Sequence, residues 1–253
     1  MPQILYGLPG ALAKTPLGPE ELIRRGKILA GWAAPDVGVV VRDVPTGPAS
    51  IESAYEEYLS VPATAALFRD AEAEGFDVAI LGCFGDPGLD AMREITRAMP
   101  VVGPGEAAFH LAAMLGERFG IVTVTHGIVG PLRHLVTRCG LAGSLSGIGV
   151  IEVGVLEMAD GRDGTLAAVR ERGRQLLAAG ADVIVLGCMT MAFLDVTAEL
   201  ENDLGVPVVN PARAALHTAE MLARTGLRHS KRSYPAPRKL AVGSVARLED
   251  LVI

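Results

Sequence analysis

The sequence predicts an α/β protein with two pseudo-symmetric, doubly wound parallel-sheet domains. The first indication is an alternation of short Val- and Ile-rich runs with longer stretches of helical period, as expected for parallel strands covered by helices on both faces. The second is an internal repeat: residues 77–83 (DVAILGC) reappear as 182–188 (DVIVLGC), and residues 100–104 (PVVGP) reappear as 207–211 (PVVNP). Because the copies keep almost the same spacing, we expect two halves of the same design.

The predicted strands are apolar on both faces and lack the alternation of a sheet with one face in water. Several end in or next to Gly or Pro, which interrupt extended segments. The predicted strands are residues 3–7, 37–41, 77–81, 100–102, 119–124, 149–153, 182–186 and 206–209.

The stretches between the strands have helical period, and several have clear ends. Asp163-Gly164-Thr165 can begin a helix, and Ala179-Gly180 can end one. Crossovers through such helices are right-handed in nearly all parallel sheets. The predicted helices are residues 20–30, 51–59, 63–74, 89–98, 105–117, 129–139, 165–179, 193–204 and 212–224.

The repeat also sets the expected domain boundaries. We expect residues 1–100 together with 206–225 to form the first α/β domain, and residues 101–205 to form the second. The helix at 212–224 is expected to cross back to the first domain, because its counterpart in the repeat opens the second. Residues 226–253 form a C-terminal tail of different composition, either partly disordered or docked on the surface, within which 240–245 could form a short strand or an oligomer contact. The tail gathers basic residues and prolines: Arg228, Lys231, Arg232, Arg238, Lys239, Pro235 and Pro237.

Composition limits the function classes. A formal net charge of −6 over 253 residues argues against a nucleic-acid partner, which requires a clustered basic face. No uncharged apolar run reaches the roughly 18 residues of a membrane span, and no secretory signal is recognisable at the N-terminus. Three cysteines without a C-x-x-C pair indicate a reducing compartment, so a cytoplasmic location is expected.

Cys83 and Cys188 carry the main chemical prediction. Each directly follows Leu-Gly at the end of a predicted buried strand and precedes a turn and a helix. N–H groups of a first helical turn lack intrahelical partners and favour negative charge, so we expect lowered thiol pKa values. A single cysteine there would usually be a small core residue, but two at matching repeat positions favour a shared role. Parallel sheets bind ligands at the carboxyl ends of their strands, so the active site is expected in the cleft between the domains.

Two thiols on opposite sides of one cleft suit the removal of a proton from one face of a carbon and its return to the other. One sulfur acts as thiolate and the other as thiol, and they exchange roles after each turnover. The enolate-like intermediate requires hydrogen-bond donors aimed at its oxygen. The expected donors are the backbone N–H groups of Phe84, Gly85, Met189 and Thr190.

Other polar residues receive weaker predictions. Cys139 is expected to be structural, His110 and His217 to be satisfied within helices, and His126 to lie in a surface loop or near the cleft. Asp86 is expected to cap the helix that follows Pro87, with a supporting role for Cys83 as the alternative. Thr123, Thr125 and Thr190 are strand-end hydroxyls that could line the pocket. A zinc site built from Cys83, Cys188 and a histidine lacks the usual close ligand pair, and phosphate-binding motifs are absent, so neither metal nor cofactor is expected.

Five sequence motifs carry a family resemblance: TGPASIES at 46–53, LGCFGDPGL at 81–89, Arg93-Glu94, PVVG at 100–103 with Glu106-Ala107, and LGC at 186–188. They resemble the aspartate/glutamate/hydantoin racemase superfamily, and within it the hydantoin and allantoin racemases. The resemblance covers about residues 47–223. It implies two pseudo-symmetric α/β domains, a cofactor-independent two-thiol mechanism with Cys83 and Cys188 as the catalytic pair, a ligand contact from Thr123 or Thr125, and homo-oligomers.

The sequence departs from this family after the first strand. Members usually have Asn-Pro-Asn-Thr there, whereas this chain has Gly7-Leu8-Pro9-Gly10-Ala11, so Pro9 remains as a substrate-binding candidate without the two amides. The departure puts substrate identity in doubt. The main hypothesis is a racemase or epimerase for a 5-substituted hydantoin, allantoin or a related small compound. The alternatives are an arylmalonate-type decarboxylase or maleate-type cis-trans isomerase that uses Cys188, and a non-catalytic small-ligand binding protein.

Overall fold

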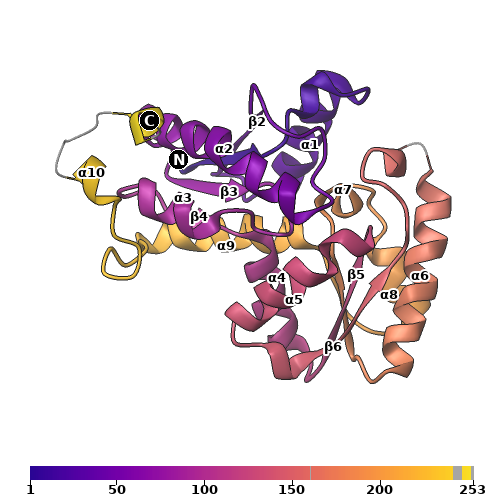
Figure 1. The fold of residues 1–253 in the computed structure, drawn as a ribbon. Coiled ribbons are helices and arrows are strands. Elements are labelled where there is room, and N and C mark those ends of the chain that lie inside the picture. Colours follow the sequence, from indigo (N-terminus) through magenta and orange to yellow (C-terminus); the bar gives the residue numbers. More distant parts are fainter. Residues whose placement is uncertain (160, 242–246, 252–253) are drawn as a thin grey trace.

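The computed structural model describes residues 1–159, 161–241 and 247–251. These residues form two four-stranded parallel sheets with flanking helices, and the two sheets have the same strand order. Figure 1 shows the two halves as neighbouring layers, indigo to magenta for the first and magenta to orange for the second. The predicted α/β class and the repetition of one parallel-sheet design are confirmed.

The first sheet has the order β2-β1-β3-β4. Its central strands are fully buried on both faces, which explains the absence of polar alternation in their sequences. The strands are β1 (Gln3–Leu8), β2 (Gly38–Asp43), β3 (Val78–Leu81) and β4 (Val101–Val102).

The second sheet repeats this arrangement in the order β6-β5-β7-β8. Strand β7 takes the place of β3, so that the two Leu-Gly-Cys segments leave equivalent strands in the two sheets. The strands are β5 (Phe119–Thr123), β6 (Leu145–Val150), β7 (Val183–Leu186) and β8 (Val208–Val209).

Helices cover both sheets, and most begin and end at recognisable signals. Ser53 accepts the Glu56 N–H at the start of α2, Asn210 accepts two N–H groups at the start of α9, and Gly75, Gly205 and Gly226 end helices in the left-handed conformation. The α-helices are α1 (Gly18–Trp32), α2 (Ala54–Glu74), α3 (Leu89–Ile95), α4 (Pro104–Leu115), α5 (Val129–Arg138), α6 (Arg162–Ala178), α7 (Met189–Ala192), α8 (Thr197–Leu204), α9 (Pro211–Thr225) and α10 (Arg238–Ala241), and the short 3₁₀ turns are Leu12–Lys14, His126–Ile128, Ala142–Ser144, Glu157–Ala159 and Leu248–Leu251.

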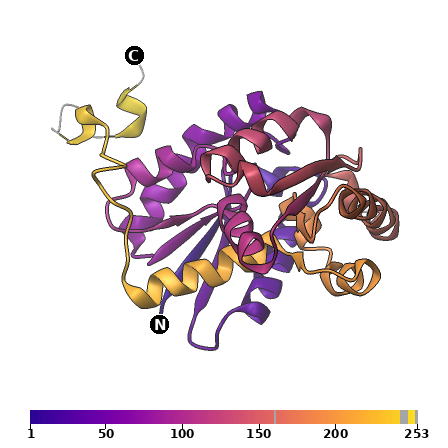
Figure 2. The same ribbon diagram turned by 90° about the horizontal axis from the view of Figure 1, so that it is seen from below.

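Helices α4 and α9 connect the two halves. Helix α4 follows β4 of the first sheet but packs on β5, β7 and β8 of the second, whereas α9 follows β8 and packs on β3 and β4 of the first. The two helices also pack against each other, and Figure 2 shows α9 crossing in front of the first sheet. The exact domain boundaries stay a prediction.

Several expected elements have different bounds. Strand β6 lies at Leu145–Val150 instead of 149–153, because Gly147 and Gly149 pack against Leu176 and Arg172 of α6, where larger residues would collide. The two helices expected at 51–59 and 63–74 form one helix, α2, with Pro62 inside it. The helix expected at 193–204 begins later, as α8 at Thr197, and Asp195, whose φ is 55°, lies in the turn between it and the preceding short helix α7.

The beginning of the tail is docked on the first half. His229 contacts the backbone of Val101, and the Lys231 ammonium donates to the Arg93 carbonyl oxygen at 2.5 Å. Of the segment 240–245, Leu240 and Ala241 belong to the short helix α10 and the remainder lies outside the described residues. Within the described parts of the chain, no helix is both long and apolar enough to cross a membrane.

Candidate active site

One small cavity lies where both sheets present the carboxyl ends of their central strands, as parallel sheets favour. Its volume is about 80 Å³, far below the roughly 300–1,000 Å³ of sites for drug-sized ligands. Both predicted thiols, Cys83 and Cys188, lie in its wall. The wall consists of Leu8, Pro9, Gly10, Leu12, Arg25, Ala49, Ser50, Ile51, Glu57, Gly82, Cys83, Phe84, Gly85, Val124, Ile128, Leu132, Val155, Gly187, Cys188, Met189 and Thr190.

Cys83 is positioned by a tight turn that follows β3. Its N–H donates to the Leu81 carbonyl oxygen at 2.7 Å, and its own carbonyl oxygen accepts the Asp86 N–H at 3.1 Å. Gly82 precedes it because any Cβ there would lie 2.8 Å from the ring of Tyr6. The turn therefore directs the thiol toward the cavity and leaves Cys83 only partly buried.

Cys188 occupies the matching position after β7 and is the N-cap residue of the short helix α7. The Gly187 N–H donates to the Val122 carbonyl oxygen at 2.7 Å, and the Gly187 carbonyl oxygen accepts the Thr123 hydroxyl at 3.1 Å. A Cβ at Gly187 would lie 2.7 Å from the Val122 carbonyl oxygen. These contacts fix the peptide that precedes the thiol.

Burial raises the pKa of both thiols, so the lowered values expected from the sequence are wrong. Removal from water is the largest effect on each sulfur, since it penalises the charged form. The Gly85 N–H works against this increase at Cys83, and the N–H groups of Met191 and Thr190 do so at Cys188. The predicted effect of the amides is present but is smaller than the cost of desolvation.

The two thiols face opposite charges. Arg25 lies in the cavity wall and is 2% exposed; it pairs with Glu21 at 2.7 Å and donates to the Thr190 hydroxyl at 3.0 Å. Its charge lowers the pKa of Cys188. Glu57 also lies in the wall, and its charge raises the pKa of Cys83. The site is therefore asymmetric, although its two halves share one fold.

The carboxylate of Glu57 has no hydrogen bond or ion pair with any of the described residues. Burial raises its pKa to about 7. One carboxylate oxygen, Oε1, lies only 2.5 Å from where a Cβ on Gly85 would be, so Gly85 leaves the space that this carboxylate occupies. Glu57 thus lies beside the Cys83 turn as an acceptor with unused capacity.

The structure places most predicted ligand-binding residues in the cavity wall: Pro9, Phe84, Gly85, Met189 and Thr190. Thr123 and Thr125 lie close by, but neither forms part of the wall. The Thr123 hydroxyl is fully buried on Gly187, and the Thr125 hydroxyl donates to the Glu52 carbonyl oxygen at 3.3 Å. Direct contact of either threonine with a ligand stays a prediction.

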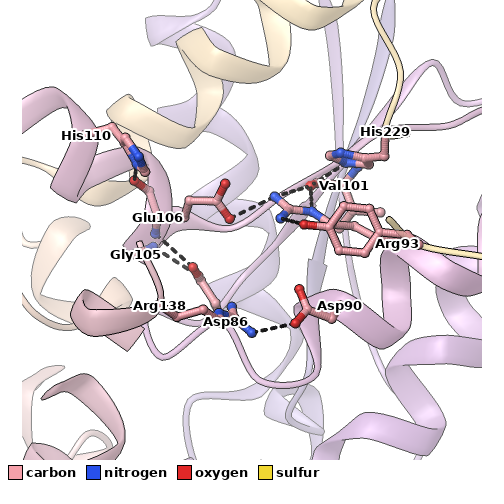
Figure 3. A network of polar contacts seen from close by, with 10 residues as sticks. Asp86, Asp90, Arg93, Val101, Gly105, Glu106, His110, Arg138 and His229 are labelled. Atoms are coloured by element: carbon pink, nitrogen blue, oxygen red, sulfur yellow. Dashed lines mark hydrogen bonds and ion pairs between the residues drawn. The ribbon is translucent and has the colours of Figure 1, made fainter. Parts of the chain in front are cut away.

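Asp86 caps a helix other than the one predicted. Its carboxylate accepts the N–H groups of Gly105 and Glu106, at 3.0 and 2.8 Å, and so caps α4 instead of α3 (Figure 3). This role could not be predicted from the local sequence, because the capped helix begins almost twenty residues after Asp86. Burial raises the pKa of Asp86 to about 7, and Glu106 continues the network to Arg93 at 2.9 Å.

The histidines and the third cysteine lie outside the cavity wall. His110 contacts the Glu106 carbonyl oxygen at 2.8 Å within α4, and His217 contacts Glu220 at 2.9 Å within α9. His126 is exposed in a loop beside Glu152, and Cys139 ends α5. Among the residues that the structure describes, no group of three or more Cys, His, Asp or Glu side chains is placed to hold a metal ion.

The sequence interpretation missed three residues of this region. Arg25 and Glu57 lie within helices α1 and α2, where charged residues usually face water, and only the tertiary fold turns them to the cavity. Tyr6 lies within β1 beneath the site, fully buried, and its hydroxyl has no hydrogen-bond partner among the described residues. Burial raises the pKa of this phenol, so it stays protonated.

Comparisons with known proteins agree with this geometry. A model of the Asp/Glu/Hydantoin racemase family matches residues 26–219. A hydantoin racemase of Pseudomonas sp. (strain NS671) is 38% identical over 210 residues, which cover 82% of this chain and 83% of that protein. An allantoin racemase of Klebsiella pneumoniae has a similar structure, with a TM-score of 0.84 and 32% identity over 94% of each chain. An allantoin racemase of Pseudomonas fluorescens gives a TM-score of 0.82 at 27% identity, over 93% of this chain and 97% of that one.

The chain belongs to the Asp/Glu/hydantoin racemase family. Its similarity to hydantoin and allantoin racemases identifies it as an isomerase of the racemase class. The family resemblance predicted from its motifs is thereby confirmed.

Proposed function

We propose that the protein is a cofactor-independent racemase that moves the α-proton of a 5-substituted hydantoin, allantoin or a related small compound between two cysteines. The observation that carries this proposal is that Cys83 and Cys188, from equivalent turns of the two sheets, line one small cavity. The ring carbonyls of such substrates make the α-proton easier to remove than that of a free amino acid. The hydantoin and allantoin racemases among the relatives support the same substrate class.

In the proposed reaction, one thiolate takes the α-proton and an enolate-like intermediate forms. The opposite thiol then gives its own proton to the other face of the carbon, so the product leaves with inverted configuration and the two sulfurs have exchanged protonation states. Backbone N–H groups of Phe84, Gly85, Met189 and Thr190 would stabilise the developing oxygen charge. Each positioned acid or base typically contributes about 10²–10⁴-fold.

The charges around the thiols support different roles for them. Arg25 favours the ionised form of Cys188, whereas Glu57 opposes ionisation of Cys83. Burial raises the pKa of both thiols, and Cys188 is therefore the one proposed to ionise more readily and act first as the base, with Cys83 as the proton donor. The enantiomer that presents its α-proton to Cys188 is then expected to react faster.

Exchange of the α-hydrogen of 5-methylhydantoin with deuterated solvent tests the two-thiol mechanism. Full racemisation should be lost in both Cys83→Ser and Cys188→Ser, because each variant lacks the acid or base on one face of the carbon. Cys139→Ser, which changes a thiol outside the cavity wall, is the matched control and should keep its rate. Racemisation that survives in either cavity variant would eliminate the mechanism.

The rival with support in the chain is an arylmalonate-type decarboxylase, because the Gly7–Ala11 segment lacks the amides expected of a hydantoin racemase. That activity would release CO₂ from a disubstituted malonate and would tolerate Cys83→Ser. Measurement of CO₂ release by the same set of variants separates the two functions.

A further inference from the structure

We propose that the Glu57 carboxylate selects ring substrates that present an N–H group, as hydantoins and other cyclic ureides do, and disfavours substrates that present a carboxylate. The inference rests on the proposed function, since it concerns the same cavity. The segment at the end of the first strand, residues 7–11, does not identify the substrate class. Glu57 is assigned this role instead.

The first support is the unused capacity of this carboxylate. Glu57 lies half-buried in the cavity wall, and its carboxylate forms no hydrogen bond or ion pair with any described residue. A half-buried carboxylate normally takes up N–H donors, because leaving its oxygens unpaired costs free energy. The turn after Cys83 leaves space for it at Gly85 instead of offering a partner.

The second support is that Arg25, the other charged side chain of the wall, already has partners within the protein. Arg25 is paired with Glu21 and bonded to the Thr190 hydroxyl, and its guanidinium lies 5.0 Å from the centre of the Phe193 ring. Its guanidinium is therefore already engaged by groups of the protein itself. Among the described wall residues, no unpaired cation remains to receive a substrate carboxylate.

Together, these two groups make the cavity selective. The remaining wall is mostly apolar, with Leu8, Ile51, Val124 and Leu132 among its members. An uncharged ring that donates N–H to Glu57 satisfies the free acceptor. A dicarboxylate would instead bring like charge beside Glu57, which costs affinity.

Binding measurements on the full-length protein test this assignment. The probes are 5-methylhydantoin, its N1-methyl and N3-methyl derivatives, and phenylmalonate. The affinity for each is measured by calorimetry. The wild type should bind 5-methylhydantoin, the parent ring, at least about 10-fold more tightly than the derivative whose methyl group replaces the N–H that faces Glu57. Glu57→Gln should bind the parent ring about 10-fold more weakly and Glu57→Met roughly 100-fold more weakly, since hydrogen bonds to charged groups are the strong ones.

Two further results are expected of the Glu57→Met protein. The N-methyl penalty should nearly disappear, because no acceptor remains, and phenylmalonate should bind more tightly than it does to the wild type. Asp70→Asn, which removes an exposed carboxylate from the same helix, α2, is the matched control and should change neither affinity. Parent-ring affinity unchanged in both Glu57 variants, or a full N-methyl penalty in Glu57→Met, overturns the assignment.

A measurement on the wild type alone keeps the inference testable if the variants fold poorly. Parent-ring affinity should rise from about pH 6 to about pH 8 as Glu57 ionises, and affinity for the sensitive N-methyl derivative should not. Other titratable or charged groups lie near this carboxylate: Cys83 in the cavity, and Asp86, His134 and Arg138 in the groove on its outer side. Glu57 is therefore identified by the difference between the pH profiles of the two ligands. Equal pH profiles for both ligands contradict the assignment. Tight N–H-dependent binding without α-hydrogen exchange would instead refute the racemase function and leave the specificity assignment standing.

Discussion

At the scale of single residues, the main feature of the site is the difference between two thiols in equivalent positions. Both follow Leu-Gly at the end of a buried parallel strand, and both have raised pKa values because of burial. The surrounding charges separate them, since Arg25 faces Cys188 and Glu57 faces Cys83. The two equivalent positions of the duplicated fold therefore differ in their chemistry: the charges favour Cys188 as the proton acceptor and Cys83 as the proton donor.

Arg25 should support both stability and the reactivity of Cys188. Its removal leaves the buried Glu21 without one of its partners, and breaking a buried ion pair typically costs about 3–5 kcal/mol. Arg25→Met should therefore lower the free energy of unfolding in urea by about 3 kcal/mol and slow alkylation of Cys188 by iodoacetamide. Arg24→Met, which removes a more exposed partner of the same Glu21, should have a much smaller effect on both. Unchanged alkylation of Cys188 in Arg25→Met would contradict the proposed electrostatic role.

Thr123 should act by positioning Gly187 and not by touching the substrate. Thr123→Val keeps the shape of the side chain but leaves the buried Gly187 carbonyl oxygen without its donor, which should cost about 1–3 kcal/mol. Unfolding experiments should show this loss, and steady-state kinetics should show a lower kcat with little change in KM. Thr137→Val removes a similar but exposed contact to the Arg133 carbonyl oxygen and is the control. A rise in KM alone would indicate direct ligand contact.

At the scale of secondary-structure elements, the fold was largely predictable because parallel strands buried on both faces leave continuous apolar runs in the sequence. The exceptions have local causes. The Gly-rich strand β6 resembled a turn, because its glycines serve to accommodate α6, and Pro62 suggested a break in α2 that packing of Thr64, Ala65 and Phe68 overrides. In the site, the positions of the two cysteines could be predicted because both lie in the repeated Leu-Gly-Cys segment. The positions of Arg25 and Glu57 depend on which face of each helix turns inward, and the local sequence does not indicate this.

Asp86 connects two of these elements, since it sits in the turn after Cys83 and caps α4. Burial raises its pKa in the folded protein from the ordinary 3.8 to about 7. The folded state therefore holds a proton that the unfolded state releases, so this residue's contribution falls as pH rises between about 4 and about 7. The loss can reach about 4 kcal/mol.

Asp86→Asn should remove this pH dependence. Its side-chain oxygen can still accept one of the two α4 N–H groups, and asparagine tolerates the left-handed conformation found here, with φ of 51°. The difference in unfolding free energy between wild type and variant should fall steadily from about pH 4 to about pH 7, measured by urea denaturation at each pH. Asp90→Asn, which removes an exposed ion pair with Arg138, should show no such trend. Parallel curves for the wild type and Asp86→Asn would refute the assigned protonation state.

At the scale of the whole molecule, the exchange of helices α4 and α9 joins the two sheets. Each helix follows one sheet in sequence and packs on the other in space, and one continuous apolar core contains residues of both sheets. Trp32 of α1 stacks on Phe193, which follows α7, with ring centres 5.9 Å apart. The cavity between the thiols is therefore held by packing that neither half possesses alone.

The two halves should consequently unfold as one cooperative unit. In urea, Trp32 fluorescence and far-ultraviolet circular dichroism should give coincident transitions, as two-state unfolding requires. Leu216→Ala, on the fully buried face of α9, should lower the unfolding free energy by about 2–5 kcal/mol and shift both transitions together. Leu227→Ala, beyond the end of α9 and exposed, is the control and should shift neither. A transition of Trp32 that separates from the loss of helix, in the wild type or in Leu216→Ala, would mean that the halves fold independently and that the cavity is assembled only when they dock.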